Sequence, residues 1–313
     1  MTQRTVRTRI DVVGVGLHTG RKIRMEVLPA AADTGIQFVR TDMKRKSGEA
    51  ALSLGISQGS GGAVISRADH ATTLSGDGFS ISTVEHLMAA FRGLGVDNAV
   101  VRLSDAEVPI MDGSAAPFVY LIKEAGLKDQ GVLRRFIQMK RPVTVMDGDR
   151  EVTIYPADHF RITYTIDFAH AAIGRQSLSR SIDERAFVNE LAPARTFCLL
   201  KDVQVLRERG LALGGSLANA VVVGDAGPLN DLRFHDEFVR HKALDLIGDL
   251  ALLGHPIVGH VVAYKAGHEM NSRLLRQLMT DRDAWSLVTK VPAAAAAPAV
   301  RAATQSMGEA ASY

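Results

Sequence analysis

One histidine and two aspartates follow one another at four-residue intervals in segment 234–253. The spacing puts His241, Asp245 and Asp249 in one line along a predicted helix, opposite an apolar stripe. Apolar residues also flank this line, so we expect the polar groups to be buried, where charges need partners or a metal ion. A His and an Asp four residues apart can converge on one ion, as two His do in zinc-binding helices. A solvated face with an ordinary His–Asp pair is the alternative.

A second candidate lies where another helix is predicted to begin, near Ser82. Glu85 precedes His86 there, so a base could stand beside a metal ligand. His86, His241 and Asp245 would form a three-ligand site with an open position, the arrangement of catalytic zinc, whose bound water becomes acidic enough to act as a nucleophile. Ser82 and Glu85 also have capping-box spacing, in which Glu85 would only accept a backbone hydrogen bond.

A third candidate is His268, which follows Gly267 and the predicted strand 258–265. It could act as a general acid, and Asp249, one turn beyond Asp245, could hold its ring. Three such features in one chain are hard to explain as independent core histidines.

The elements that must position these residues indicate an α+β fold, because each half of the chain has strands first and two helices later. The best candidate for a linker between the halves is 127–136. The predicted strands are 9–13, 23–28, 98–103, 136–145, 150–156, 161–167, 220–223 and 258–265, and the predicted helices are 82–94, 115–125, 182–190, 202–208, 234–253 and 271–281.

Composition limits the class of protein. The chain has 313 residues, enough for two domains, with 46% hydrophobic and 23% charged residues, as in ordinary globular proteins. Its single Cys excludes a disulfide framework and a Cys-based zinc site, and it suits the reducing cytoplasm. The net charge of +3 is too small to indicate a nucleic-acid binder. We expect neither a membrane span nor a secretory signal, because no apolar run is long enough.

The C-terminal segment 292–313 has 10 Ala in 22 residues and no apolar periodicity. We predict that this tail is disordered. An Ala-rich helix is the alternative, which Pro292 and Pro298 oppose.

Several familiar motifs are absent from the sequence. Segment 14–20 is Gly-rich but has the wrong spacing for dinucleotide binding, and there is no Walker A motif. Segment 213–217 lacks the second flanking Gly of a nucleophile elbow, so a serine hydrolase is not indicated. Cys198 has no base beside it in the sequence and is interpreted as a small packing residue.

A set of short motifs carries a resemblance to one family. Each motif is weak alone, but together they cover residue 14 to about 275 and are specific. The chain resembles the UDP-3-O-acyl-N-acetylglucosamine deacetylases, the zinc amidases of lipid A synthesis in Gram-negative bacteria. The motifs are Gly14-Val-Gly-Leu-His-Thr-Gly20, Ser82-Thr-Val-Glu-His-Leu87, Asp97-Asn98, Val108-Pro-Ile-Met-Asp-Gly-Ser114, Ile166-Asp-Phe168, Ala194-Arg-Thr-Phe197, Gly214-Gly-Ser216, His241-Lys-x-x-Asp-x-x-Gly-Asp249 and Gly267-His268.

The resemblance implies one catalytic Zn²⁺ per chain, held by His86, His241 and Asp245. It implies that Glu85 deprotonates the zinc water and that Thr196 polarises the acetyl carbonyl and holds the oxyanion. Hydrolysis of an amide needs both, because the carbonyl resists attack by water. Whether zinc or iron(II) fills the site in cells stays open.

The resemblance also assigns the leaving-group side and the substrate contacts. His268 would protonate the leaving amine with Asp249 as its partner. Lys242 and Lys265 would meet the diphosphate and nucleotide portion, with Lys242 also counted among the catalytic residues; an ordinary surface charge is the alternative for Lys242. The remaining substrate-binding residues would be Phe168, which would contact the uridine, Phe197 and Gly215.

Some positions stand apart from this scheme. His18 resembles a residue that helps hold an inhibitory second zinc, and a turn His without a role in turnover is its alternative. Cys198, Ala171 and Leu213 depart from the family pattern at positions near the acyl passage. These departures leave the preferred acyl length open, but they do not affect the reaction.

The fold implied by the resemblance is two α+β domains of similar topology, each a mostly antiparallel sheet layered on two helices, with the active site between them. We expect the first domain at 1–130 with an insert near 50–80. We expect the second at 131–290 with an insert near 167–192 that lines an apolar tunnel for the acyl chain.

The implied activity is hydrolysis of the 2-acetamido group of UDP-3-O-(3-hydroxyacyl)-N-acetylglucosamine to the free amine and acetate, the committed step of lipid A biosynthesis. We expect a monomeric cytoplasmic enzyme without a nucleic-acid partner. One rival is a non-catalytic zinc or nucleotide-sugar binding protein, which has no use for Glu85, Thr196 and His268 together. Another rival is a zinc amidase that acts on a different acetylated sugar.

Overall fold

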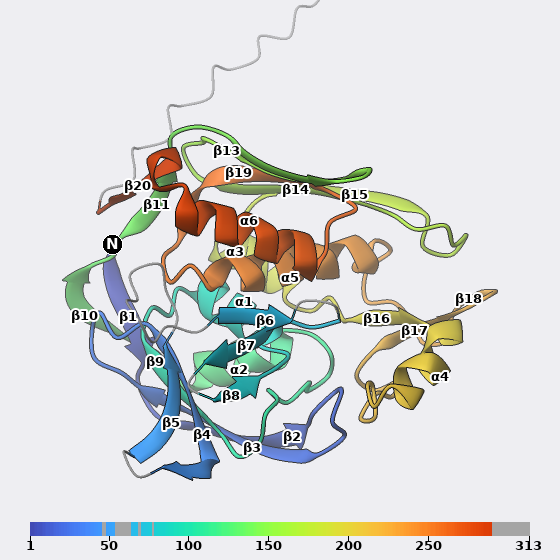
Figure 1. Ribbon diagram of the computed structural model, residues 1–313, viewed down its shortest axis with the longest axis horizontal. Helices are drawn as coiled ribbons and strands as arrows, with labels where there is room; N and C mark the ends of the chain where they lie inside the picture. Colours follow the sequence, from blue (N-terminus) through green and yellow to red (C-terminus); the bar gives the residue numbers. More distant parts are fainter. Residues whose placement is uncertain (46–47, 54–63, 68–69, 77, 290–313) are drawn as a thin grey trace, which may run out of the picture.

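Two β-sheets enclose two pairs of helices in the computed structural model, which describes residues 1–45, 48–53, 64–67, 70–76 and 78–289 (Figure 1). One helix pair packs on each sheet, and the pairs meet in the middle of the molecule. The predicted disordered tail, 292–313, lies outside the described residues.

The first half of the chain forms a five-stranded sheet with the order β2-β3-β9-β4-β5. Only β9 and β4 are parallel neighbours; the other neighbours are antiparallel. Burial alternates along β3, where Ile23, Met25 and Val27 point into the core, as expected for a strand with one covered face. The strands are β2 (Ile10–Val15), β3 (Lys22–Pro29), β9 (Ala99–Leu103), β4 (Ile36–Arg45) and β5 (Gly48–Ser53).

The second half repeats this pattern in its seven-stranded sheet. Five strands follow the order β12-β13-β19-β14-β15, with β19 and β14 again the parallel pair. β11 and β20 extend the sheet beside the start of β19. The predicted similar topology is therefore confirmed. The strands are β12 (Val143–Asp147), β13 (Arg150–Tyr155), β19 (Ile257–Tyr264), β14 (Phe160–Asp167), β15 (Arg175–Ser181), β11 (Phe136–Met139) and β20 (Trp285–Val288).

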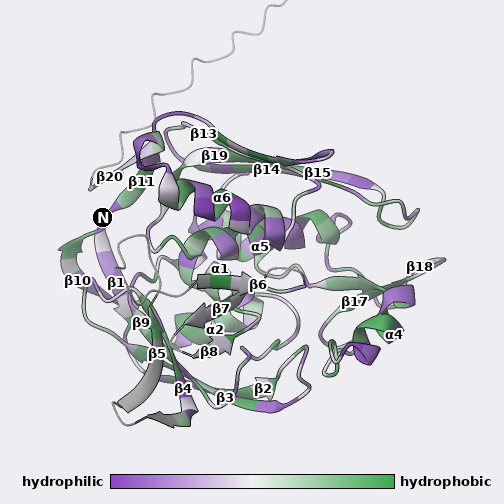
Figure 2. Ribbon diagram, viewed as in Figure 1, coloured by the Kyte–Doolittle hydropathy of each residue, from purple (hydrophilic) through white to green (hydrophobic). Residues whose placement is uncertain are grey.

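Each half supplies one helix before its central parallel strand and one after it, which confirms the α+β class. The contact between the halves runs along α1 and α5, and both are buried over most of their length. Hydrophilic residues colour much of the visible face of α6 (Figure 2). The helices are α1 (Glu85–Leu94), α2 (Ala116–Ala125), α5 (Glu237–Ala251) and α6 (His268–Thr280).

Smaller elements surround this frame. β16 pairs in parallel with β17, which pairs with β18, and α4 packs beside β16 and β17 at one side of the molecule (Figure 1). These elements are β6 (Val64–Arg67), β7 (Thr73–Gly76), β8 (Phe79–Ile81), α3 (Glu184–Ala186), a π-helical turn (Phe187–Leu191), β16 (Phe197–Leu199), α4 (Leu200–Glu208), β17 (Val221–Gly224), β18 (Gly227–Pro228) and a 3₁₀ turn (Arg282–Ala284).

The predicted linker, 127–136, lies between α2 and β11 but is not an irregular segment. β10 (Leu127–Leu133) is a strand that pairs antiparallel with β1 (Thr2–Val6), so most of the segment is ordered by the N-terminal strand. Its exposed side chains show no apolar alternation, which is why the sequence suggested a linker. The domain boundary near residue 130 stays a prediction.

Other differences concern where elements begin. The segment predicted as one strand, 136–145, is two strands separated by a turn at Pro142, which has no N–H to donate to a ladder. β15, inside 167–192, was missed because its mostly polar residues are largely exposed at the sheet edge. The last helix begins at His268, three residues earlier than predicted. Among the described residues, no helix is long and apolar enough to cross a membrane.

Candidate active site

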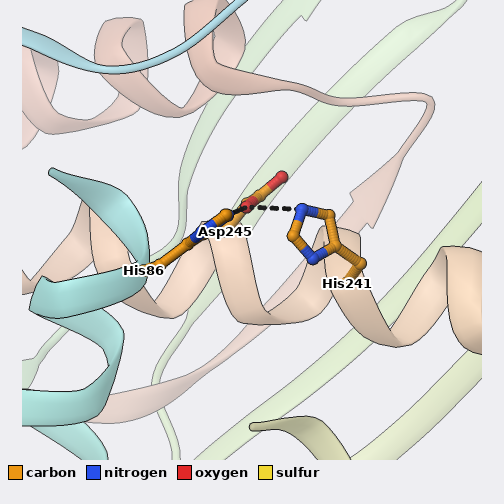
Figure 3. A group of neighbouring side chains, drawn as sticks. All are labelled: His86, His241 and Asp245. Carbon is orange, nitrogen blue, oxygen red and sulfur yellow. Dashed lines mark ion pairs between the residues drawn. The ribbon is translucent and has the colours of Figure 1, made fainter. Parts of the chain in front are cut away.

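The three predicted metal ligands converge in the contact between α1 and α5. His86 lies in the first turn of α1, whereas His241 and Asp245 lie one turn apart on α5 (Figure 3). The Oδ1 atom of Asp245 is 3.5 Å from Nε2 of His86 and 3.3 Å from Nε2 of His241. One ligand atom from each residue lies within 4.8 Å of the others. All three side chains are buried.

Backbone hydrogen bonding fixes the ring of His241. Its Nδ1 lies 3.0 Å from the carbonyl oxygen of Ala194, which can only accept, so Nδ1 carries the proton and Nε2 is left as a ligand atom. Burial lowers the pKa of His241 to about 3. The ring is therefore neutral, the form in which histidine binds metal ions.

The carboxylate of Asp245 is held in its charged form. Burial by itself raises the pKa of Asp245, but the surrounding groups, among them the Lys242 ammonium, together lower it well below its usual value. Lys242 donates to Oδ2 of Asp245 at 2.9 Å. Oδ1 is buried and accepts no hydrogen bond from any described residue.

These observations fit a bound metal ion. A buried carboxylate oxygen without a donor is costly, and it faces the ligand nitrogens of two histidines. Two imidazoles and one carboxylate are a usual ligand set for zinc with an open position. α1 and α5 pack closely at this point. A Cβ atom on Gly248 would lie only 2.0 Å from the carbonyl oxygen of Glu85.

Glu85 does not form the capping box that was the alternative. α1 begins at Glu85, and its N-cap residue, Val84, makes no side-chain cap bond. Oε2 of Glu85 accepts a hydrogen bond from the backbone N–H of Thr72 at 3.1 Å. Burial, followed by the nearby carboxylates, raises the pKa of Glu85, although His268 and His86 oppose this. A buried carboxylate with a raised pKa is suited to general base catalysis.

His268 and Asp249 form a buried pair, as predicted. Nδ1 of His268 lies 2.9 Å from Oδ2 of Asp249. Burial lowers the pKa of His268, but Asp249 and Asp245 outweigh it and raise the pKa to about 9. Nε2 points to the ligand cluster, 3.6 Å from Oδ2 of Asp245 and 3.9 Å from Oε1 of Glu85. The pair thus presents a protonated ring to the same site as Glu85.

An apolar cavity of about 400 Å³ lies beside the cluster, because the ring of its lining residue Phe197 is 6.4 Å from that of His241. Thr196, Phe197 and Gly215 line it, as does Cys198. The backbone of Thr196 is fixed on both sides, because its N–H donates to the carbonyl of Gly113 and its carbonyl accepts from the N–H of Val221, both at 2.8 Å. Thr196 also lies two residues beyond Ala194, the partner of the His241 ring.

The lining of the cavity does not include the predicted acyl-passage insert. None of its lining residues comes from 167–192, and the role of that segment stays a prediction. They come instead from the loop at Leu17 and His18, from His70, and from 196–229, which contains β16, α4 and β17. Packing between segments that are far apart in the sequence therefore builds the cavity.

The predicted substrate-binding residues divide into two groups. The ring of Phe197 is 5.6 Å from that of Phe168, and Nζ of Lys242 lies 5.7 Å from the centre of the Phe197 ring, so these three lie together. Phe197 and Lys242 also contact the metal ligands His241 and Asp245. Lys265 instead follows the end of β19, where its ammonium pairs with Asp149 at 2.7 Å and Asp167 at 3.5 Å. It has left-handed backbone geometry, with φ at 52°.

Comparison with known proteins identifies the family. Residues 3–280 match the sequence model of the family described as UDP-3-O-acyl N-acetylglycosamine deacetylase. Proteins named UDP-3-O-acyl-N-acetylglucosamine deacetylase are similar over nearly their full length. The protein of Citrifermentans bemidjiense is 45% identical over 95% of this chain and 95% of its own. That of Pseudomonas entomophila is 46% identical over 91% and 93%, and that of Hahella chejuensis is 46% identical over 92% and 93%.

The chain belongs to the UDP-3-O-acyl-N-acetylglucosamine deacetylases. The predicted family is confirmed, and with it the class of enzyme, a hydrolase that acts on an amide. This deacetylase family consists of metalloenzymes, in agreement with the His-His-Asp cluster. The roles of the individual residues stay predictions.

Sequence reasoning missed three buried residues that hold parts of this deacetylase site. Thr72 contacts Glu85, Asp249 and His268, and Asn271 donates to Oδ2 of Asp249 at 2.8 Å. Neither residue belongs to a motif. Asn271 lies three residues after His268, so the corrected start of α6 would have indicated it.

The third missed residue is Glu107, which organises the loop that carries His18. Its carboxylate accepts from the backbone N–H groups of His18 and Thr19 at 2.8 and 2.9 Å, and from the hydroxyls of Thr19 and Thr83. Nδ1 of His18 lies 3.4 Å from the N–H of Ala212, so the loop also contacts the second half of the deacetylase.

Proposed function

We propose that this chain uses one Zn²⁺ to hydrolyse the 2-acetamido group of UDP-3-O-acyl-N-acetylglucosamine. The main observation in support is that His86, His241 and Asp245 lie in one buried cluster with the carboxylate of Glu85 and the protonated imidazole of His268. Family membership supports the substrate, since the similar proteins bear the name of this activity. A binding protein would need the three ligands but neither Glu85 nor the His268–Asp249 pair.

When bound, the ion supplies Lewis acidity for water and for the amide carbonyl. Glu85 accepts a proton from the attacking water while the oxygen of that water bonds to the carbonyl carbon. The raised pKa of Glu85 makes it a stronger base than an exposed carboxylate. Thr196 donates its hydroxyl hydrogen to the developing oxyanion, and its backbone is already fixed at the edge of the cavity.

The second half of the reaction breaks the C–N bond. Free amide anion is a poor leaving group, so the nitrogen must gain a proton as it departs. His268 donates that proton from Nε2, and Asp249 holds the ring through Nδ1 and stabilises its positive charge. The products are acetate and the 2-amino sugar.

The substrate's other parts fit the surroundings of the cluster. The fatty chain occupies the apolar cavity beside Thr196 and Gly215. Lys242 neutralises charge next to the site, and Phe168 with Phe197 offers a ring surface to the nucleotide. Lys265 reaches the diphosphate if that anion displaces Asp149, whose carboxylate is exposed. Monomeric state and cytoplasmic location stay predictions.

Acetate release from UDP-3-O-(3-hydroxyacyl)-N-acetylglucosamine, measured beside metal content, tests the proposal. We expect stoichiometric acetate and amine, with about one zinc ion per chain. UDP-N-acetylglucosamine without the acyl chain is the matched control substrate, and we expect it to react far more slowly because it leaves the cavity empty. Tight substrate binding without acetate release would indicate the binding-protein alternative. Equal turnover of both substrates would indicate an amidase for another sugar.

A further inference from the structure

One buried threonine contacts every proposed proton-transfer group. The hydroxyl of Thr72 lies 2.5 Å from Oδ1 of Asp249 and 3.2 Å from Nδ1 of His268. The backbone N–H of the same residue donates to Oε2 of Glu85 at 3.1 Å. Thr72 is 1% exposed, so water does not compete for these bonds.

The direction of each hydrogen bond follows from the partners. Nδ1 of His268 donates to Oδ2 of Asp249, so this proton is already used. The hydroxyl of Thr72 therefore donates to Oδ1 of Asp249, its shorter contact. Together with the amide of Asn271 on Oδ2, both carboxylate oxygens have donors, and the plane of the carboxylate is fixed.

The backbone of Thr72 acts on the opposite side of the site. Its N–H orients one oxygen of Glu85, leaving Oε1 as the atom nearer to Nε2 of His268. Its carbonyl accepts from the N–H of Val84 at 3.5 Å, just before α1 begins. The segment before β7 thus connects the start of α1 to the residues of α5 and α6.

We propose that Thr72 is a positioning residue for the reaction, which sets the orientation of the His268–Asp249 pair through its hydroxyl and that of Glu85 through its N–H. The inference rests on the proposed function. A threonine that only filled space in the core would need no such bonds. The hydrogen bond from the hydroxyl of Thr72 to Oδ1 holds the carboxylate of Asp249 so that its Oδ2 accepts from Nδ1 of His268. Nε2 of His268, which carries the other ring proton, then faces the site.

Removal of the hydroxyl tests this inference. Thr72→Val has nearly the same shape, and Thr72→Ser keeps the hydroxyl; Thr72→Ala serves as the variant without a hydroxyl if Thr72→Val does not fold. Thr73→Val is the matched control, because Thr73 is the next residue and, in the part of the chain that the structure describes, its side chain makes no hydrogen bond to Glu85, Asp249 or His268. Steady-state acetate release, zinc content and the unfolding temperature are measured for each.

We expect Thr72→Val to lower kcat on the order of 10–100-fold, as for other residues that orient a reacting side chain. KM should change less than about threefold and zinc content should stay at about one, since Thr72 is neither a ligand nor a substrate contact. Thr72→Ser should recover most of kcat. In a double-mutant cycle with Asp249→Asn, the second substitution should add little, because both act on the orientation of His268.

Three results would overturn the inference: a parental kcat for Thr72→Val, an equal loss for Thr72→Ser and Thr72→Val, or additive losses with Asp249→Asn. The same data separate this inference from the proposed function. If the parent releases no acetate, the proposed function fails. If the parent is active and Thr72→Val is unaffected, only the positioning role fails.

Discussion

Nδ1 of His268, the first residue of α6, lies 2.9 Å from Oδ2 of Asp249 on α5, 19 residues earlier in the chain. The strand β19 runs between the two helices and returns the chain so that their side chains meet. The pair places a charged imidazole beside the metal ligands. Its removal is therefore the most direct test of the leaving-group step.

We predict that His268→Ala lowers kcat by on the order of 10²–10⁴, the usual loss for general acid catalysis, and changes KM much less. The reason is that the proton is transferred only in the transition state. Zinc content should stay at about one, because His268 is not a proposed ligand. Asp249→Asn should give a milder defect. Loss of the metal from His268→Ala would show instead that His268 is a ligand.

Glu85→Gln should keep the fold and the metal while it lowers kcat by on the order of 10²–10⁴. The amide can still pair with the N–H of Thr72 through its oxygen, but it cannot accept a proton at neutral pH. Single-turnover acetate release measures the rate of the reaction, and thermal unfolding measures the stability of the fold. A normal kcat with a lowered unfolding temperature would reduce Glu85 to a structural role.

Chelation should abolish activity, and about one equivalent of Zn²⁺ should restore it. Removal should also lower the unfolding temperature, since an ion that binds only the folded state stabilises it by about 4 kcal/mol at a free concentration of 1,000 times Kd. Excess Zn²⁺ should inhibit if Glu85 and His18 bind a second ion. Calorimetric titration of the metal-free chain measures binding apart from turnover. Full activity after verified removal of the metal would refute the zinc mechanism.

Gly248→Ala should destabilise the fold by about 1–3 kcal/mol, the usual cost of overpacking. The added Cβ atom would lie 2.0 Å from the carbonyl oxygen of Glu85. Because that oxygen belongs to the backbone, the clash can be relieved only if α1 moves. Urea unfolding measures the change. Gly224→Ala is the control, because the nearest atom there is the end of a leucine side chain at 3.3 Å. Equal stability of the two variants would contradict the tight helix contact.

Stability should fall in mildly acidic solution partly because of His255. Burial, with a smaller effect of Arg135 and Arg92, lowers its pKa from 6.5 to about 4 in the folded chain. Between these values the unfolded chain binds a proton that the folded chain does not, so stability is lost as the pH falls from about 7 to about 4. His255→Gln should reduce the difference in unfolding free energy between pH 7.5 and pH 5. An unchanged difference would contradict this assignment.

Local spacing determined the parts of the site that lie on one element. The four-residue interval between His241, Asp245 and Asp249 is one helical turn, so the helix alone lines them up. Gly95 ends α1 in the left-handed conformation expected of a C-cap glycine. The family motifs also carried the resemblance, which the comparisons confirm.

Only the tertiary structure decided which groups meet across long separations. Thr72 is bonded to Glu85 and Asp249, and the carbonyl of Ala194 fixes the ring of His241. The same holds for β10, whose strand character depends on pairing with β1, and for the apolar cavity, whose walls come from both halves of the chain. The physical reason is that sequence periodicity reports which face of an element is buried, whereas a hydrogen-bond partner or a cavity wall is supplied by whatever segment the fold packs against that face.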